Sequence, residues 1–413
     1  MVFVINMNVG LPNLITGWLL KLKARQAMRR RKFRKFELKS KDKVFMQKLL
    51  RDGQMRSSIL AAILSLTMLV SCQQSPQPTI ATLPPATLTT VSTPPANVST
   101  AETTAPVSPA APDSSPLAIS AMRSKAYPGS DIIMERTLSA GPGYNRYVVS
   151  YQSDGLKLFG LLTVPTGDKP AGGWPVILLN HGYIPPAEYS TDQSYAGIVA
   201  PLAAAGYIVF KPDYRGHDNS PGTPYQVYVS PGYVTDSLNA LASIRKYKDA
   251  NPDKIGVWGH SMGGNITLHE LVLTHDFKAA VIMAGVVGSY SAIIDWWSAR
   301  VATGVLTTQN DLQTDQQLLQ MVSLHGTPQT DPGYWNAIDP TYFISNVETP
   351  VQIQVGSADV VVPPGFSQQL TAQLQNAGKS VTYHSYPGAD HNLSPDTSAA
   401  MAEAIAFFNQ YLK

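Results

Sequence analysis

Residues 255–273 read IGVWGHSMGGNITLHELVL, and this stretch carries the clearest indication of the fold. Its first four residues form a short apolar run, which is typical of a strand buried on both faces, and a helical pattern begins at Met262. The pentapeptide Gly-His-Ser-Met-Gly, residues 259–263, lies between them. A strand that turns sharply into a helix here would expose the hydroxyl of Ser261 at the turn, and the two glycines would relieve collisions with the neighbouring strand and helix.

The alternation of strands and helices extends on both sides of this stretch. Strands are predicted at residues 147–151, 156–164, 175–180, 207–210, 255–258, 279–284, 350–355 and 381–386. Helices are predicted at residues 193–205, 234–248, 262–273, 364–377 and 397–412. This order predicts an α/β fold with a mostly parallel central sheet and helices on both faces. The first two strands would form a hairpin that turns at Asp154-Gly155. Residues 288–345 break the alternation and are predicted to form a small helical cap.

Three residues predict serine-hydrolase chemistry. A serine hydroxyl is a weak nucleophile and needs a base, and α/β hydrolases order the three partners as Ser, acid and His along the chain. Among the histidines that follow Ser261, only His391 lies in a loop after the last predicted strand, so it is the predicted general base. Asp359 follows the preceding strand and is the predicted acid that orients the imidazole. Asp390, the neighbour of His391, is the alternative acid.

Further residues are candidates for the rest of an active site. An oxyanion must meet N–H donors that are already in place. The predicted donors are the backbone N–H groups of Met262 and of Tyr183, although the Tyr183 hydroxyl could donate instead or its ring could wall the pocket. The candidate walls of the substrate pocket are Trp296, Trp297 and Trp335. Their alternative role is ordinary packing within the cap.

The N-terminal part of the chain has the layout of an export signal. Residues 57–71, SSILAAILSLTMLVS, form an uncharged apolar run of about 15 residues after several basic ones. This run is too short to span a bilayer comfortably, which takes about 20 residues, and it fits a secretory signal. Its end, Leu69-Val70-Ser71-Cys72, resembles a bacterial lipobox, which implies that Cys72 is lipidated and becomes the mature N-terminus. An uncleaved signal anchor is the alternative.

A tether is predicted to separate this signal from the folded part. Residues 73–116 are rich in Pro, Thr, Ser and Ala without periodicity, so they should stay extended and disordered. The expected organisation is a basic N-terminus with signal peptide at 1–71, lipidated Cys and tether at 72–116, and an α/β-hydrolase domain at 117–413. We therefore expect an exported protein that is lipid-anchored at the bacterial cell envelope. The basic run MRRRKFRKF leaves open whether translation starts at Met1, Met46 or Met55.

Composition limits the classes of function. The chain has 413 residues, of which 44% are hydrophobic and 14% charged, enough apolar material for a sizeable core. Residues 1–56 hold 15 of the 31 Lys and Arg residues, so the folded remainder is acidic and a nucleic-acid partner is not expected. Cys72 is the only cysteine, which excludes an intramolecular disulfide and a Cys-rich zinc site. No metal cluster or nucleotide loop is seen in the sequence, so we expect no cofactor; the oligomeric state stays open.

The stretch from about residue 145 to 411 resembles the catalytic domain of the prolyl oligopeptidase family, which includes acylaminoacyl- and dipeptidyl-peptidases. The matching pieces are YQSDGLKLFGLLTVP, NHGY, KPDYRGH, WGHSMGG, TPVQIQVGSADVVVP and YPGADHNL. The resemblance implies the α/β-hydrolase fold and a serine peptidase that works through an acyl-enzyme on a small molecule or short peptide. Only about 30 residues separate the tether from the first predicted strand, so the β-propeller of such peptidases is not expected. Carboxylesterase and dienelactone-hydrolase relatives share these motifs, so an esterase is the alternative, followed by a non-catalytic ligand-binding lipoprotein.

Overall fold

The computed structural model of the chain describes residues 115–413. The predicted signal segment, Cys72 and the tether as far as residue 114 lie outside the described residues.

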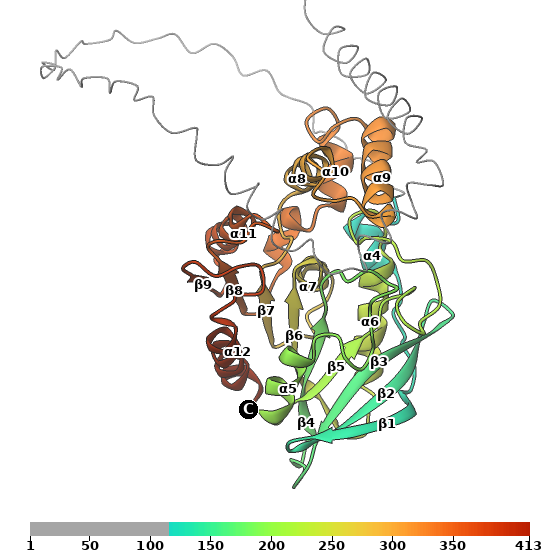
Figure 1. The fold of residues 1–413 in the computed structure, drawn as a ribbon, viewed down its shortest axis with the longest axis vertical. Coiled ribbons are helices and arrows are strands. Elements are labelled where there is room, and N and C mark those ends of the chain that lie inside the picture. Colours follow the sequence, from blue (N-terminus) through green and yellow to red (C-terminus); the bar gives the residue numbers. More distant parts are fainter. Residues whose placement is uncertain (1–114) are drawn as a thin grey trace, which may run out of the picture. The chain divides into compact units, whose positions relative to one another are not determined.

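A single sheet runs through the described part of the chain, with the strand order β1-β2-β3-β5-β4-β6-β7-β8-β9 (Figure 1). Its strands are β1 (Ile133–Gly141), β2 (Tyr144–Ser153), β3 (Leu156–Pro165), β4 (Trp174–Asn180), β5 (Ile208–Pro212), β6 (Ala250–His260), β7 (Ala279–Met283), β8 (Val351–Gly356) and β9 (Val381–Tyr386). The pairs β1–β2, β2–β3 and β3–β5 are antiparallel, and every pair from β5 to β9 is parallel. The predicted mostly parallel sheet is therefore confirmed.

Helices connect the parallel strands, form the segment between β7 and β8, and also lie before β1 and after β9. They are α4 (Ile119–Ser124), α5 (Ala196–Ala204), α6 (Gly232–Ile244), α7 (Met262–Leu273), α8 (Tyr290–Ala302), α9 (Gln309–His325), α10 (Pro332–Ile338), the 3-10 helix η1 (Pro340–Asn346), α11 (Pro364–Asn376) and α12 (Thr397–Leu412). Figure 1 shows α8, α9 and α10 grouped at one end of the domain. They occupy most of the range in which the sequence predicts a cap.

Side chains of the central strands pack alternately into two separate apolar cores, one on each face of the sheet. In β4, Val176 and Leu178 belong to the cluster that contains side chains of α6, α7 and α11. Ile177 and Leu179 belong to the cluster that contains side chains of α5 and α12. Successive strand residues point to opposite faces, so a continuous apolar run is what a strand covered by helices on both sides requires.

The hairpin of β2 and β3 turns where the sequence predicts. Ser153 pairs with Leu156, and Asp154 and Gly155 have φ values of 49° and 77°. Positive φ at both central residues is the requirement of a type I′ hairpin turn, which Asp-Gly satisfies at little cost.

The largest differences from the predicted strands are at β1 and at the start of β6. β1 (Ile133–Gly141) is absent from the predicted strands because it is an edge strand with mostly exposed side chains, so it carries no alternation of apolar and polar residues. β6 begins at Ala250, five residues before the predicted start, because its first part, Ala-Asn-Pro-Asp-Lys, contains no apolar run. Pairing with β2 and with β4 extends the sheet in these two places.

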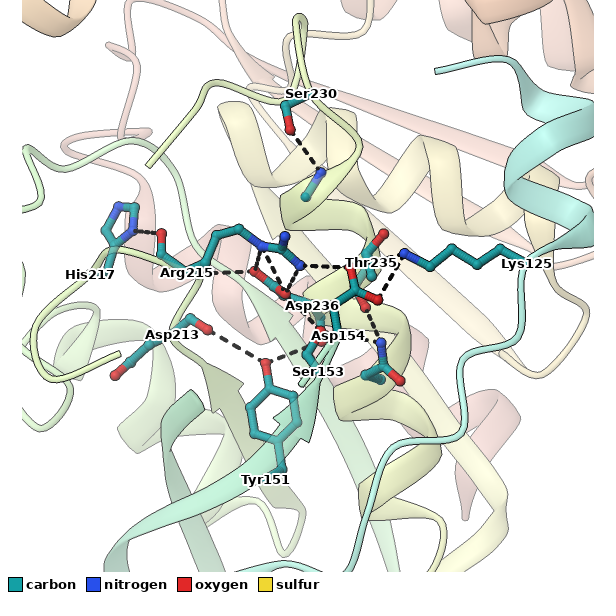
Figure 2. A network of polar contacts seen from close by, with 12 residues as sticks. Lys125, Tyr151, Ser153, Asp154, Asp213, Arg215, His217, Ser230, Thr235 and Asp236 are labelled. Carbon is teal, nitrogen blue, oxygen red and sulfur yellow. Dashed lines mark hydrogen bonds and ion pairs between the residues drawn. The ribbon is translucent and has the colours of Figure 1, made fainter. Parts of the chain in front are cut away.

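A buried ion pair anchors the loop after β5 (Figure 2). The Arg215 guanidinium donates to both carboxylate oxygens of Asp236, with Nη2 to Oδ1 at 2.7 Å. The Asp236 side chain is fully buried and also accepts from Ser153 Oγ at 2.7 Å, while Arg215 Nη2 lies 3.2 Å from Asp154. This network ties the hairpin turn to α6 and to the loop, which continues to Tyr228 in the wall of the cavity described below.

Candidate active site

Ser261 occupies a strained turn between β6 and α7. Its φ of 55° and ψ of −121° lie in a region that costs a residue with a side chain about 1–3 kcal/mol. Three backbone hydrogen bonds of 3.0 Å hold this conformation, because the Ser261 N–H donates to Met283 and its carbonyl accepts from Gly264 and Val286. The turn leaves the Ser261 side chain at the wall of a cavity.

The glycines on either side of Ser261 are needed for close packing. A Cβ on Gly263 would collide with the carbonyl oxygen of Asn180 at the end of β4. A Cβ on Gly259 would collide with the Thr267 hydroxyl and with the Gly263 carbonyl oxygen. These contacts confirm the steric reason that the sequence indicates for both glycines.

His391 and Asp359 form a hydrogen-bonded pair. His391 Nδ1 lies 2.8 Å from Asp359 Oδ2, and the Asp359 side chain is fully buried. Asp359 Oδ1 accepts from the backbone N–H groups of Val361 at 2.8 Å and Val362 at 2.9 Å. Because the carboxylate can only accept, it selects the tautomer with the proton on Nδ1, which leaves the His391 Nε2 free to take a proton.

The loops after β8 and β9 bring this pair together. Ser357 N–H donates to the Tyr386 carbonyl and Ala358 N–H donates to the Ala389 carbonyl, both at 3.0 Å. A Cβ on Gly356 would collide with the carbonyl oxygens of residues 389 and 390. The two adjacent parallel strands therefore end at the same edge with their loops in direct contact.

Asp390, the alternative acid, makes other contacts. It is exposed, and its Oδ1 accepts from the backbone N–H groups of Asn392 and Ser394, each at 2.9 Å. The Asp390 carboxylate thus caps the turn that follows it, whereas the His391 ring pairs with Asp359.

Ser261 and His391 both line a cavity of about 630 Å³. Among the contacts of the described residues, no hydrogen bond joins the Ser261 hydroxyl to the His391 ring. Catalytic hydrogen bonds are often long without substrate and shorten in the reacting complex. Proton transfer from the Ser261 hydroxyl to His391 Nε2 therefore requires a bound group that brings the two side chains together.

The residues predicted to bind an oxyanion lie in the wall of the same cavity. Met262 is the first residue of α7, so its N–H has no acceptor within the helix. Gly182 packs against Ser261, since a Cβ built on it would lie 3.0 Å from the Ser261 Cβ. Tyr183 follows Gly182 and also lines the cavity. Binding of an oxyanion by the Met262 and Tyr183 N–H groups stays a prediction.

Two of the three candidate tryptophans line the cavity. Trp296 and Trp297 of α8 do so, and Trp296 Nε1 donates to the Val361 carbonyl at 3.2 Å. The prediction for Trp335 is wrong: it is buried beside Tyr290 in a separate apolar cluster, and its Nε1 donates to the Gly326 carbonyl at 3.0 Å. Trp335 is on α10, which contributes to a cluster with Leu117 and Ala118 at the start of the domain.

The cavity also has lining residues that the sequence analysis does not identify. Arg300 of α8 donates from Nη1 to the Val360 carbonyl at 3.0 Å, one residue beyond the acid. His260 and Tyr195 contact each other at 2.6 Å beside the nucleophile. The only available signal was the position of His260 inside the pentapeptide, because the other residues lie in segments without a recognisable motif. Gln226, Tyr228 and Leu306 are among the other lining residues.

Within residues 115–413, no group of three or more His, Cys, Asp or Glu side chains is arranged to hold a metal ion. In the same part of the chain, no helix combines the length and hydrophobicity that crossing a membrane requires.

Comparison with known proteins places this site in a family. The model of the prolyl oligopeptidase family matches residues 193–413. The chain is 28% identical over 246 residues to YuxL of Bacillus subtilis, described as an uncharacterized peptidase, and the match covers 58% of this chain and 34% of YuxL. It is 24% identical over 249 residues to YtmA of the same organism and description, covering 60% of this chain and 87% of YtmA. The chain thus spans about a third of the length of YuxL and most of YtmA.

Solved structures share the fold. The acylaminoacyl peptidase of Pyrococcus horikoshii superposes with a TM-score of 0.52 at 20% identity, over 66% of this chain and 42% of its own. Acetyl xylan esterase 1 of Thermoanaerobacterium sp. JW/SL YS485 superposes with a TM-score of 0.52 at 17% identity, over 71% of this chain and 91% of its own. At these identities the likeness is one of fold, and that fold is the α/β hydrolase.

Proposed function

This chain belongs to the prolyl oligopeptidase family of hydrolases, and from this we propose that it cleaves an acyl bond of a short peptide through the nucleophile Ser261. The observation that carries the proposal is the 2.8 Å hydrogen bond between His391 and the buried Asp359, beside a cavity that Ser261 also lines. A base oriented by a buried carboxylate, in the same cavity as a serine on a strained turn, is the arrangement that nucleophilic acyl transfer uses.

In the first half of the reaction, Ser261 Oγ attacks the carbonyl carbon of the substrate and its proton passes to His391 Nε2. The carbonyl oxygen becomes an oxyanion that the N–H groups of Met262 and Tyr183 would bind. The imidazolium then donates its proton to the leaving amine as the C–N bond breaks, which leaves an acyl group on Ser261. Asp359 stays ionised and stabilises the imidazolium throughout.

In the second half, water replaces the amine. It loses a proton to His391 Nε2 and attacks the acyl carbon, and collapse of the second oxyanion returns the proton to Ser261 Oγ. The acyl group leaves as a carboxylic acid, and the enzyme is restored. An ester follows the same steps with an alcohol as the leaving group.

The walls of the cavity favour an apolar group next to the scissile bond. Four aromatic side chains line the cavity. Tyr183 lies in the loop that begins after Asn180 of β4, the oxyanion loop, Tyr228 lies in the loop before α6, and Trp296 and Trp297 lie on α8. Pockets of about 300–1,000 Å³ accommodate small organic ligands, so the cavity suits an aminoacyl or dipeptidyl group with an apolar side chain. The description of YuxL and YtmA as peptidases favours the amide over the ester.

A test combines a covalent probe with paired substrates. We expect a fluorophosphonate to label the wild-type protein on Ser261 and to leave the variant Ser261→Ala unlabelled. Aminoacyl- and dipeptidyl-p-nitroanilides with apolar side chains should be cleaved, and p-nitrophenyl esters should be cleaved as well because an alcohol leaves more easily than an amine. Absence of labelling in folded protein would overturn the proposal and favour a ligand-binding protein. Cleavage of esters alone would assign the chain to the carboxylesterases.

We further propose that the chain is exported and held at the cell envelope by a lipid on Cys72. The supporting features are the apolar run at 57–71 and the four residues that end in this cysteine. Wild-type protein should incorporate an alkyne fatty acid and sediment with membranes, whereas Cys72→Ala should do neither. A Cys72→Ala protein that still sediments with membranes would favour an uncleaved signal anchor.

A further inference from the structure

His260 is hydrogen-bonded at both ring nitrogens to parts of the active site. Its Nδ1 lies 2.6 Å from the Tyr195 hydroxyl, and its Nε2 lies 3.1 Å from the backbone carbonyl oxygen of His391. The Tyr195 hydroxyl also accepts from the Gly182 N–H at 2.7 Å. A chain of three hydrogen bonds therefore runs from the oxyanion loop, past the residue before the nucleophile, to the loop of the general base.

The chemistry of the two ends sets the direction of every bond in this chain. The Gly182 N–H can only donate, and the His391 carbonyl can only accept. His260 must therefore carry its proton on Nε2, which makes Nδ1 an acceptor. The Tyr195 hydroxyl fills the remaining role, since it accepts from Gly182 and donates to His260 Nδ1. All three bonds are satisfied by one neutral tautomer of His260.

The surroundings keep both side chains in these protonation states. Burial and, to a lesser degree, the neighbouring His391 ring, 4.7 Å away between centroids, lower the pKa of His260 to about 3. Burial raises the pKa of the Tyr195 hydroxyl above its usual value. At neutral pH, His260 is therefore uncharged and Tyr195 keeps its proton.

Close packing adds a second constraint at the same place. A Cβ built on Gly182 would lie 2.6 Å from the Tyr195 hydroxyl and 3.2 Å from His260 Nδ1, in addition to its contact with Ser261. Tyr195 itself has a left-handed φ of 64° at the start of α5, a conformation that a bulky residue adopts only when its surroundings compensate. A shift of this hydroxyl would thus shift Gly182 and the next amide, that of Tyr183.

We propose that Tyr195 and His260 are positioning residues. They hold the oxyanion loop and the loop after β9 that carries His391 at fixed positions relative to Ser261. The inference rests on the proposed acyl-transfer function and deepens it. Neither side chain takes part in bond making. Tyr195 acts through the Tyr183 N–H, and His260 acts through the backbone of His391.

Substitutions can separate the two ends of the chain. Tyr195→Phe removes the hydroxyl and both of its bonds. His260→Gln places an amide N–H near the former Nε2, so it retains a donor for the His391 carbonyl and loses the acceptor for Tyr195. His260→Asn places an amide oxygen near the former Nδ1 and has the opposite effect. Tyr207→Phe is the matched control, because it removes one phenol hydrogen bond, 2.8 Å to Asn409, from a fully buried ring remote from the cavity.

The readouts are kcat and KM on a p-nitrophenyl ester and the rate of fluorophosphonate labelling. We expect Tyr195→Phe to lower kcat and the labelling rate about 10- to 100-fold with KM nearly unchanged, because small misplacements of catalytic groups have effects of this size. Tyr207→Phe should change kcat less than about twofold, although it also loses a phenol hydrogen bond. This contrast separates positioning from a general loss of stability.

A double-variant cycle gives the sharper test. Tyr195→Phe and His260→Gln break the same bond, so the double variant should be scarcely slower than the slower single variant. Tyr195→Phe and His260→Asn break different bonds, so their losses of kcat should nearly multiply. Folded Tyr195→Phe with wild-type kcat, or multiplying losses in both cycles, would overturn the proposal. If Tyr195→Phe does not fold, the two His260 variants provide the test. A wild-type kcat in both of them would overturn the proposal. Failure of the proposed function itself is distinct, since wild-type protein would then not react with the probe.

Discussion

The substitution Asp359→Asn tests the acid–base pair most directly, because the structure dictates how the amide must sit. Asp359 Oδ1 receives two backbone N–H donors, from Val361 and Val362, and Oδ2 receives His391 Nδ1–H. Asparagine has one carbonyl oxygen, and the two backbone donors retain it. The amide NH₂ then faces His391 Nδ1, so the imidazole must move its proton to Nε2, where it can no longer accept the Ser261 proton.

The size of the effect follows from this tautomer. Where the acid of a Ser-His-Asp triad is replaced by its amide, kcat falls about 10⁴-fold. We expect a loss of about 10³- to 10⁴-fold here, which is about 4–5.5 kcal/mol in the activation barrier. The loss of stability should be small, about 1 kcal/mol, because the backbone N–H bonds persist and only lose the contribution of the charge.

The assay is hydrolysis of a p-nitrophenyl ester together with fluorophosphonate labelling, on protein whose fold is checked by circular dichroism. Asp390→Asn is the matched control, since it makes the same chemical change at the exposed neighbour of His391 and should alter kcat less than about twofold. Folded Asp359→Asn protein with activity within tenfold of wild type would refute the reasoning. A larger loss in Asp390→Asn would assign the role of acid to that residue.

Three other predictions concern the packing around the site. Gly263→Ala should lower the free energy of unfolding by about 2–3 kcal/mol in urea titrations, because its methyl group collides with the Asn180 carbonyl, and unchanged stability would contradict this. Trp296→Ala should raise KM for apolar substrates, because Trp296 lines the cavity. Trp335→Ala, at a buried site, should leave KM unchanged and lower the free energy of unfolding by about 3–5 kcal/mol. Equal effects of the two variants on KM would contradict the placement of Trp296 in the cavity and Trp335 outside it. Burial raises the pKa of Glu270 from 4.5 to about 8, so the native state retains a proton that the unfolded state releases, and stability should fall by up to about 1.4 kcal/mol per unit as pH rises from 5 to 8. Glu270→Gln should lack this slope in urea titrations at several pH values.

The sequence predicts structure well where a local pattern of residues is required by sterics or by the periodicity of a strand or helix. Apolar runs such as 175–180 predict strands buried on both faces, and the structure confirms them as the parallel core. Asp154-Gly155 predicts the hairpin turn because few residue pairs accept positive φ at both positions. Edge strand β1 (Ile133–Gly141) is not predictable in this way, since its exposed side chains are under no such demand.

Some residues of the candidate site could likewise be predicted from the sequence, and others could not. The order of Ser261, Asp359 and His391 along the chain singles them out, because parallel strands end at one edge of the sheet and their loops meet there. The place of Trp335 could not be predicted, since whether an apolar side chain faces a cavity or its own helical neighbours depends on how the cap packs.

By itself, then, the sequence determined the fold class, the turn that carries Ser261 and the residues from which a triad can be built, because each of these is written in the spacing of neighbouring residues. Only the tertiary structure decided which groups meet around them. His260 bonds to a hydroxyl 65 residues before it and to a carbonyl 131 residues after it. No local pattern encodes such pairings, because they arise when separate loops are packed against one another at the edge of the sheet and every buried polar group must find a partner.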